Sequence, residues 1–410
     1  MKTELVGVEL WDGTASLGLS TIRWAFEGAD ARFTAVAGAV AAGGSGAGGA
    51  DGRPPLTVIP GLIDTHVHLA GYAGAGSPDF LTWPLVTRPE EQVLHALANA
   101  RKALAAGVTT VRDLSANDVQ FSLRRALEAG IIEGPRLQAH GMVGMTAGHG
   151  DLFTPAAFTT RPLTADGPDE CRKLVRHWAR AGADGIKIAT SGGVLSVGDK
   201  SAWRNYTRSE IAAIIDEAHA LGLRVAAHAH TEDGIRIALE EGVDSLEHAT
   251  LLSPELAARV VSAGATVAPT LLINDAIAAG SAGVSAEQSS KAQQLVVLRD
   301  ALFRDAAQLG VDFVLGTDAN GHHVAFGDQL AEVRRMAELF GWTAGRALES
   351  ATSRAASAIG RGSDLGRVAP GYLADFVLLD SRPFDDIGGL SVDHIVAVVS
   401  RGRVVSGSLD

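Results

Sequence analysis

The chain has 410 residues, of which 46% are hydrophobic and 20% charged, with a formal net charge of −12 and one cysteine, Cys171. A chain of this length buries one large core or two smaller ones. The lone cysteine excludes an intrachain disulfide and a thiolate metal cluster, so any metal must be held by His, Asp, Glu or Lys. The acidic balance argues against a nucleic-acid partner, because phosphate binding needs clustered Lys and Arg.

Neither a membrane span nor a signal peptide is expected. No apolar stretch reaches the roughly 18 residues that a membrane span needs. The first residues, Met1–Leu5, lack the charged-then-apolar layout of a signal peptide. We therefore expect a cytoplasmic protein without a membrane partner.

The first 56 residues contain short alternating runs, typical of strands with one buried face. They include a segment, residues 37–50, made only of Gly, Ala, Ser and Val. This composition predicts a flexible or hairpin connection.

The next apolar run, residues 58–63, leads into His66 and His68. Residues i and i+2 of a strand point to the same face, so a His-x-His pair at a strand end aims two imidazoles at one point. Histidine is also the commonest metal ligand. The pair therefore indicates the start of a metal site, with a surface pair in a loop as the alternative.

Six further segments repeat one layout: a helical stretch that ends at a glycine, a short apolar strand, and then a polar residue. Glycine is the usual left-handed cap of a helix, and strands buried on both faces are short and apolar. Helix starts are marked by Pro89, by the capping box of Thr207 and Glu210, and by Ser253 before Pro254. The six segments are Gly107–Asp113, Gly182–Lys187, Gly222–His228, Gly242–His248, Gly264–Thr270 and Gly310–Asp318.

The strand before His66 and another at Pro135–Ala139 bring the count to eight. Eight such units over residues 57–365 predict an α/β fold, a (β/α)8 TIM barrel, whose catalytic groups lie at the C-terminal ends of the strands. A doubly wound open sheet is the competing fold. It would gather its ligands near one switch point rather than from strands all around.

After residue 365 the pattern returns to strands joined by turns. Apolar runs at Asp375–Asp380, Ile395–Ser400 and Arg403–Val405 follow the turn signals Pro370-Gly371 and Arg401-Gly402. Neither end of the chain has enough apolar surface to fold alone. Residues 1–56 and 366–410 are therefore expected to pair into one small β-sandwich domain.

Six polar residues at the predicted strand ends form a candidate metal site. Imidazole and carboxylate suit zinc-like ions, and two ions about 3.5–4 Å apart can activate one bridging water and polarise a carbonyl. Lys187 is the odd member, because an ammonium is a poor ligand. Carbamylation by carbon dioxide would turn it into a carboxylate that can bridge two ions. The six are His66, His68, Lys187, His228, His248 and Asp318.

Together these features resemble the amidohydrolase superfamily over essentially the whole chain. Within it, the chain looks most like the binuclear metal-dependent prolidase and carboxypeptidase group, which includes amidases that cleave an amino acid from an aryl-carbonyl cap. The stretches that carry the resemblance are Pro60–His68, Lys187–Gly193, His228–His230, Ser245–His248, Gly316–Ala319 and Pro370–Asp375.

The resemblance implies a role for each ligand. Two divalent ions, with zinc expected, would be held by His66, His68 and Asp318 (the more buried ion) and by His228 and His248 (the more exposed ion), with carbamylated Lys187 as the bridge. Asp318 would also act as general base and then general acid, passing a proton from the bridging hydroxide to the departing amine.

Four further residues are candidates for the substrate site. His149 lies in a Gly-His-Gly segment that matches the family, and it is expected as a catalytic group that binds the scissile carbonyl or its oxyanion, against a reading as a surface histidine. His230 shares a strand face with His228, although the group often has tyrosine there. His323 and Tyr206, in the loops after the eighth and fourth strands, are the other candidate contacts, although exposed loop histidines are common and the tyrosine could merely cover the barrel top.

Two charged groups are interpreted separately. Arg112-Asp113, at the end of the second strand, is expected to take part in a structural salt bridge inside the barrel rather than in catalysis. A substrate carboxylate would need a basic partner, and the loop after the fourth strand offers Lys200, Arg204 and Arg208.

Three functions stay open. The first is hydrolysis of the amide bond of Xaa-Pro dipeptides or of N-acyl and aryl-acyl amino acids. The second keeps the fold but acts on a cyclic amide, lactone or ester, or is a mononuclear deaminase, which the lysine at the fourth strand disfavours. The third is a non-enzymatic scaffold, which the six filled ligand positions disfavour. The expected partners are a small-molecule or dipeptide substrate and further copies of the chain in a homo-oligomer.

Overall fold

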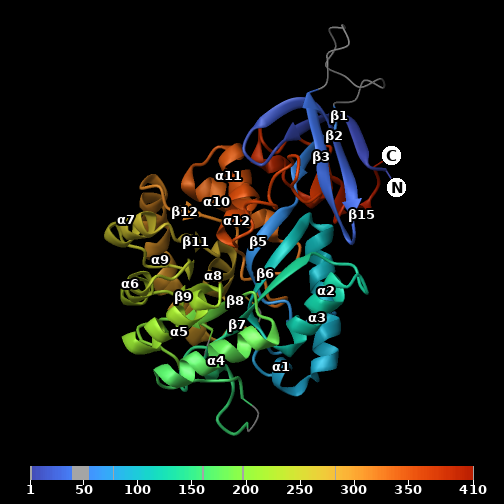
Figure 1. Ribbon diagram of the computed structural model, residues 1–410. Coiled ribbons are helices and arrows are strands. Elements are labelled where there is room, and N and C mark those ends of the chain that lie inside the picture. The colour runs from blue at the N-terminus through green and yellow to red at the C-terminus, as the bar shows by residue number, and fades with distance from the viewer. Residues whose placement is uncertain are drawn as a thin grey trace.

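The computed structural model describes residues 2–38, 55–76, 78–158, 161–195, 198–281 and 283–409. Eight parallel strands lie at the centre of the larger part, helices surround them, and a separate sheet lies at one end (Figure 1). Most of the connection expected at residues 37–50 lies outside the described residues, since only 37 and 38 belong to a described strand.

The central sheet contains eight parallel strands in chain order, each hydrogen-bonded to the next. They are β5 (Leu62–Val67), β6 (Val108–Ala116), β7 (Arg136–Met142), β8 (Gly185–Ala189), β9 (Arg224–Ala229), β10 (Ser245–His248), β11 (Thr266–Ala268) and β12 (Asp312–Phe313). Beyond β12 the chain returns to β5, where Thr65 N donates to Leu315 O at 2.9 Å and Asp318 N donates to His66 O at 2.8 Å. These bonds join the first and last strands and confirm the expected TIM-type barrel.

Helices cover the outside of the barrel (Figure 1). Helix starts follow the sequence signals: α2 begins at Pro89, and Thr207 and Glu210 form the expected capping box of α5. All five residues of β8 are buried, as expected for a strand enclosed on both faces. The helices are α1 (Trp83–Val86), α2 (Pro89–Ala105), α3 (Asp118–Glu128), α4 (Pro168–Ala181), α5 (Arg208–Ala220), α6 (Glu232–Glu241), α7 (Pro254–Ala263), α8 (Leu271–Ala278), α9 (Ala286–Gln308), α10 (Gln329–Phe340), α11 (Ala344–Ala351) and α12 (Ser353–Ala358).

Both ends of the chain contribute to the second sheet, as predicted. Its strands lie in the order β15-β14-β13-β4-β1-β2-β3. Its core is mainly aliphatic and contains three aromatic rings in contact: the ring of Phe376 lies 5.2 Å from that of Trp24 and 6.0 Å from that of Phe33, between centroids. The strands are β1 (Glu4–Trp11), β2 (Ser16–Glu27), β3 (Asp30–Gly38), β4 (Thr57–Pro60), β13 (Phe376–Leu379), β14 (Ile395–Ser400) and β15 (Arg403–Gly407).

The apolar run before His66 is two strands rather than one. β4 pairs with β1 and β13 in the small sheet, and only β5 enters the barrel. Pro60 has no N–H to continue a ladder. At Gly61 a Cβ would lie 2.1 Å from Thr109 Oγ1, so the close approach of the Thr109 side chain to this backbone requires glycine. The small sheet therefore includes the four residues Thr57–Pro60, beyond the boundary expected after residue 56.

A buried ion-pair cluster connects the barrel to the small sheet. Arg136, at the start of β7, donates to Asp375 Oδ2 at 2.6 Å and lies 2.9 Å from Asp30 Oδ1. Asp375 also accepts a hydrogen bond from Arg401 N at 2.6 Å. These groups lie at the N-terminal end of the barrel strands, away from the ends that carry the predicted ligands. They hold the barrel and the small sheet together.

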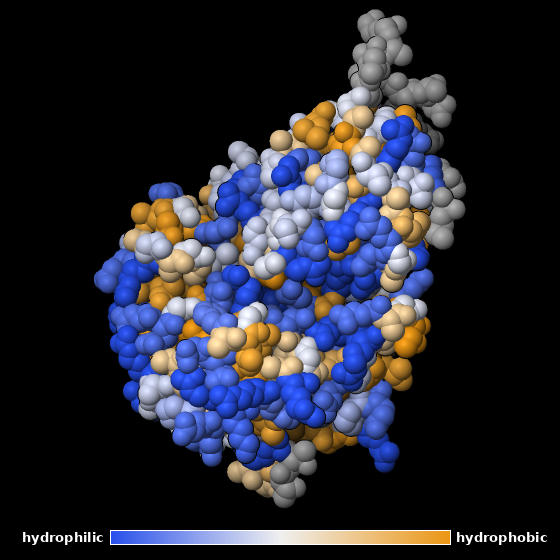
Figure 2. Space-filling view, in the orientation of Figure 1, coloured by the Kyte–Doolittle hydropathy of each residue, from blue (hydrophilic) through white to orange (hydrophobic). Residues whose placement is uncertain are grey.

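The visible surface mixes polar and apolar residues, with apolar patches interrupted by hydrophilic residues (Figure 2). Within the described ranges, none of the helices has the combination of length and hydrophobicity that a membrane crossing requires.

Candidate metal centre

The barrel brings all six predicted ligands to the C-terminal ends of its strands. The ring centroid of His66 lies 5.4 Å from that of His68 and 5.2 Å from that of His248, and His248 lies 4.7 Å from His228. His68 is one-third exposed, whereas the other ligands are buried or nearly so. The six come from β5 (His66), the residue just after it (His68), β8 (Lys187), β9 (His228), β10 (His248) and the segment after β12 (Asp318).

Two triads within this cluster have geometry suited to a metal ion. The ligand atoms of His66, His248 and Asp318 all lie within 4.8 Å of one another. The same holds for His228, His230 and His248. His248 therefore lies between two potential ion positions. His230, which is expected to contact the substrate, is close enough to His228 and His248 to be a metal ligand itself.

Hydroxyl and carboxylate partners orient the imidazole rings. His66 Nδ1 lies 2.9 Å from Glu247 Oε2, and His66 Nε2 lies 3.4 Å from Asp318 Oδ1. His248 Nδ1 lies 2.7 Å from Thr270 Oγ1. In both rings Nδ1 has a protein partner, and Nε2 is the potential metal ligand, which in His66 lies beside the carboxylate of Asp318. This is the arrangement in which outer partners fix the tautomer and direction of a ligating histidine.

The backbone at these strand ends is strained. Among the described residues, six other than glycine have positive φ, and four of them are His248 (φ 68°), Ala249 (φ 47°), Thr270 (φ 47°) and Asp318 (φ 57°). Left-handed backbone is costly for residues with a Cβ, and such strain gathers at functional sites. Here the strained backbone carries two predicted ligands and the hydroxyl that orients one of them.

Burial sets the protonation of the basic groups. Burial lowers the pKa of Lys187 to about 8, although Glu247 and Asp318 act in the opposite direction. Burial also lowers the pKa of His66 to about 4. A neutral imidazole is the form that binds a metal, so His66 needs no deprotonation near neutral pH.

Asp318 remains ionised because neighbouring basic groups outweigh the effect of burial on its pKa. Burial alone would raise the pKa of its carboxyl group, but His66, His68 and Lys187 outweigh that effect and lower the pKa to about 2. Its Oδ1 lies 3.0 Å from His68 Nε2. An ionised carboxylate beside imidazole rings is a donor set that fits a divalent cation.

Glu247, which belongs to the Ser245–His248 stretch, lies next to the predicted ligand His66. It is fully buried, lies 2.9 Å from Arg112 Nη2, and accepts a hydrogen bond from Ser245 Oγ at 2.7 Å. The expected salt bridge inside the barrel is therefore present, and Glu247 is the partner of Arg112. Asp113 instead accepts a hydrogen bond from Leu69 N at 2.7 Å. The role of Glu247 could have been inferred from the alternation along β10, because Ser245 and Glu247 lie on the same face of the strand.

His149 lies directly against the predicted ligands. Its ring stacks on that of His228, with centroids 4.1 Å apart and an angle of 16° between the planes. Its Nδ1 lies 3.6 Å from Oδ2 of the buried Asp199, which also accepts from Gly193 N at 2.7 Å. A Cβ at Gly193 would lie 2.2 Å from the His149 ring. The glycine thus makes room for His149, and Asp199 lies next to its ring although no sequence motif identified it.

Tyr206 is not brought to the site. Its side chain is 2% exposed within the barrel core, and its hydroxyl donates to the carbonyl oxygen of Val143. This placement argues against the expectation that Tyr206 contacts the substrate, because its ring is buried and its hydroxyl already has a backbone partner. His323, in contrast, is half-buried in the loop after β12, with Nδ1 3.5 Å from Ser281 Oγ.

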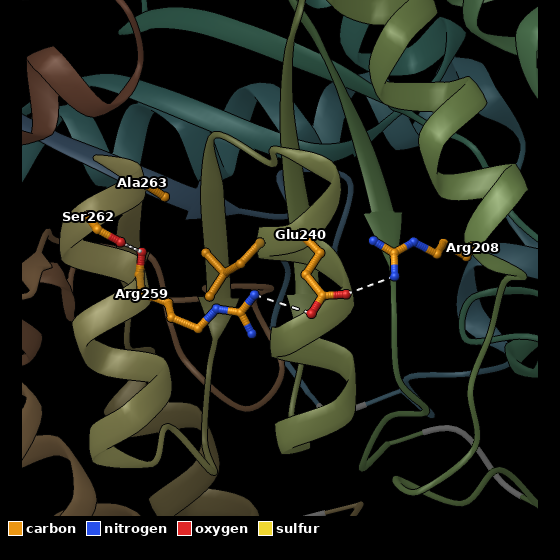
Figure 3. Close-up of a pocket in the computed structure, with 6 residues that line it drawn as sticks. Arg208, Glu240, Arg259, Ser262 and Ala263 are labelled. Carbon is orange, nitrogen blue, oxygen red and sulfur yellow. Dashed lines mark hydrogen bonds and ion pairs between the residues drawn. The ribbon is translucent and has the colours of Figure 1, made fainter.

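Arg208 is likewise engaged away from the strand ends. It pairs with Glu240 at 3.0 Å and with Glu241 at 2.6 Å. Arg259 approaches Glu240 from the other side at 3.2 Å, around a hollow of about 550 Å³ beside helices α5, α6 and α7 (Figure 3). Arg208 is therefore a structural residue of the outer helical face, and only Lys200 and Arg204 remain of the basic candidates for a substrate carboxylate.

The fold and the strand-end cluster together define a TIM-barrel hydrolase. Residues 57–405 match the amidohydrolase family, and the chain belongs to this family. Ochratoxinase of Aspergillus niger is 30% identical over 373 residues, which cover 85% of this chain and 75% of that protein.

Solved structures are similar over nearly the whole chain. A Xaa-Pro dipeptidase with bound methionine has a TM-score of 0.86 at 28% identity, with 99% of this chain and 100% of that chain covered. A prolidase complexed with N-methylphosphonate-L-proline has a TM-score of 0.87 at 31% identity, with the same coverage. The structure of A. niger ochratoxinase has a TM-score of 0.84 at 25% identity, covering 99% of this chain and 96% of that one.

Proposed function

We propose that the protein is a binuclear metal-dependent hydrolase that cleaves the amide bond of N-acyl or aryl-acyl amino acids, or of Xaa-Pro dipeptides. The observation that carries this proposal is the convergence of His66, His248 and Asp318, with their ligand atoms within 4.8 Å, beside His228 and Lys187. Similarity to proteins named ochratoxinase and Xaa-Pro dipeptidase supports an amide substrate.

The proposed ligands divide between two ions, with zinc expected. His66, His68 and Asp318 would hold one ion and His228 and His248 the other, with carbamylated Lys187 between them. The lowered pKa of Lys187 supports the carbamate, because the neutral amine is the form that adds carbon dioxide and releases a proton. When bound, the two ions supply a hydroxide nucleophile at neutral pH and polarise the carbonyl oxygen.

Two side chains of the protein would manage the proton and the carbonyl oxygen. Asp318 is ionised and bordered by His66 and His68, so its carboxylate can accept a proton and then deliver it to the departing amine. His149, placed beside His228 and paired with Asp199, can donate a hydrogen bond to the carbonyl oxygen as negative charge develops there.

The first test is metal content per chain by elemental analysis, together with hydrolysis of a panel of Xaa-Pro dipeptides, N-acyl and aryl-acyl amino acids, and lactones. We expect near two metals per chain and cleavage of an amino-acid amide. One metal, or lactone turnover alone, would favour the cyclic amide, lactone or ester alternative. If the protein contains no metal and hydrolyses none of these compounds, the remaining alternative is a non-enzymatic scaffold.

Substitution of the two charged ligands tests the mechanism. Asp318→Asn is expected to lower kcat by roughly 10²- to 10⁴-fold, because proton transfer contributes that range. Lys187→Ala is expected to lose both activity and metal, while circular dichroism shows an intact fold. Lys173→Ala, at an exposed lysine of α4, is the matched control and should change neither. A Lys187→Ala variant with full activity and full metal content would remove the binuclear model.

A further inference from the structure

Four aromatic rings from three loops meet where the barrel strands end. Phe80 lies between β5 and α1, Phe153 ends the short 3₁₀ helix η1 (Asp151–Phe153) after β7, and His322 and His323 follow β12. The centroid of the Phe80 ring is 6.2 Å from that of Phe153, 5.2 Å from that of His322 and 5.3 Å from that of His323. Phe80 therefore connects loops that are far apart in the sequence.

The ring cluster continues into the candidate metal centre. The ring of Phe153 lies 5.1 Å from that of His149 at 70°, an edge-to-face contact. His149 in turn stacks on His228 at 4.1 Å. An unbroken series of ring contacts therefore runs from the loops to a predicted metal ligand and passes through the residue proposed to bind the scissile carbonyl.

The rings at the loops are only partly covered by the protein. Phe80, Phe153, His322 and His323 are all half-buried. Tyr206, in contrast, is packed into the core with its hydroxyl satisfied. Aromatic pairs prefer edge-to-face or offset contacts at 4.5–7 Å, so a partly covered ring beside a reaction site can accept one more ring. Binding sites for small molecules are typically lined by apolar and aromatic side chains around a few polar groups, as here.

We propose that Phe80 and Phe153, flanked by His322 and His323, form a subsite that binds an aromatic ring of the substrate beside the scissile amide. This inference rests on the proposed function and narrows its substrate class to amino-acid amides that carry an aryl group. The ring can belong to the acyl cap or to the amino acid that leaves. The subsite would bind either ring by the same contacts. The test therefore uses substrates that carry the ring on one side of the amide or on the other.

The test compares kcat/KM for three amides. N-benzoylglycine has its ring on the acyl side, N-acetylphenylalanine has it on the amine side, and N-acetylalanine has none. We expect Phe80→Ala and Phe153→Ala each to lower kcat/KM roughly tenfold for at least one ring-bearing amide, and to leave N-acetylalanine within about twofold. The amide that is affected identifies the side that carries the ring.

Three controls keep the result interpretable. Phe26→Ala removes a half-buried phenylalanine of the small sheet, which packs against Arg403, and should leave all three rates unchanged. Metal content per chain should equal that of the unmodified protein in every variant. Phe80→Leu and Phe153→Leu keep apolar volume without the ring, and they replace the alanine variants if these unfold. Equal losses for all three amides, or no loss for any, would overturn the subsite.

A binding measurement separates failure of this inference from failure of the proposed function. If no amide is hydrolysed, the proposed function fails, and titration calorimetry of the zinc-loaded protein with benzoate and with phenylalanine still tests the subsite. Binding of either compound that weakens about tenfold in both variants supports the aromatic subsite. Binding of neither compound, or binding that both variants retain, overturns it.

Discussion

The two ends of the barrel differ in how their buried charges are arranged. At the C-terminal ends of the strands, imidazoles and carboxylates crowd together on strained backbone, and ring nitrogens are left as potential ligands. At the N-terminal ends, Arg136 is paired with Asp375 and Asp30. Carboxylates thus have two different settings: at the first end they lie among the imidazoles of the proposed metal centre, and at the second they are paired with arginine. Changes at the first end should therefore alter metal binding, and changes at the second should alter stability alone.

Glu247→Gln should produce the largest combined effect, because Glu247 lies beside an imidazole and is also paired with arginine. The substitution removes the charge opposite Arg112 and disturbs the partner of His66 Nδ1. We expect metal affinity to fall roughly 10- to 100-fold, as for other outer partners of ligating histidines. Leaving Arg112 buried without its counter-charge should also lower the free energy of unfolding by about 3–5 kcal/mol.

Competition with a chelator measures the metal affinity of this variant, and urea unfolding measures its stability. Glu241→Gln is the matched control, since Glu241 pairs with Arg208 on the outer helical face. It should leave metal affinity unchanged. Unaltered metal affinity in Glu247→Gln would show that Glu247 does not orient His66.

Arg136→Met isolates the other end of the barrel. It leaves Asp375 buried without its main partner, so we expect the free energy of unfolding to fall by about 3–5 kcal/mol. Metal content and kcat/KM, assayed well below the unfolding temperature, should stay within about twofold of the unmodified protein. Loss of metal in a folded Arg136→Met variant would contradict the separation of the two ends.

His230→Asn tests whether His230 contacts the substrate or binds a metal ion. If His230 contacts the substrate, as the sequence indicated, the variant should keep near two metals and lose roughly 10- to 100-fold in kcat/KM, the effect of one hydrogen bond to a charged group. Its Nδ1 lies 2.8 Å from Thr250 Oγ1 and its ring is buried. A fall to one metal per chain would instead identify His230 as a ligand, as the triad with His228 and His248 allows.

Asp30→Asn should have the smallest effect. Burial raises the pKa of Asp30, but Arg136 and Arg401 outweigh it and hold the pKa below the ordinary value of 3.8. The ionised form therefore adds stability that is present above pH 3.8 and is lost as pH falls through the lower native value. Because Asp30 is one-third exposed, the loss at pH 7 should stay below about 1 kcal/mol. Urea unfolding from pH 7 to pH 3 should show the two proteins converging in acid.

The barrel and the convergence of the candidate ligands could be predicted from the sequence because both depend on local patterns. Glycine caps and apolar runs gave the number of strands, and the parallel order placed their ends together. The break at Pro60-Gly61 was missed because its cause is non-local: β4 pairs with β13, more than 300 residues away, and Gly61 approaches Thr109. A continuous apolar run does not show which sheet its first half joins.

The outer partners of the site were harder to predict for the same reason. Asp199 reaches His149 from another loop, and Thr270 reaches His248 from the next strand end, so spacing within one segment gives no signal. Tyr206 was misplaced because a loop position was read as a position facing the substrate. Its ring instead fills the barrel core, and its hydroxyl finds a backbone partner there.

The position of β4 has a consequence for the order in which the molecule can form. β4 lies between β1 and β13 in the small sheet and leads directly into the first barrel strand. During synthesis β4 leaves the ribosome long before β13 exists, so one of its edges must wait for the last strands of the sheet. Contacts of such long sequence separation slow folding. The strand that leads to His66 and His68 is therefore paired on both of its edges only after nearly the entire chain has been made.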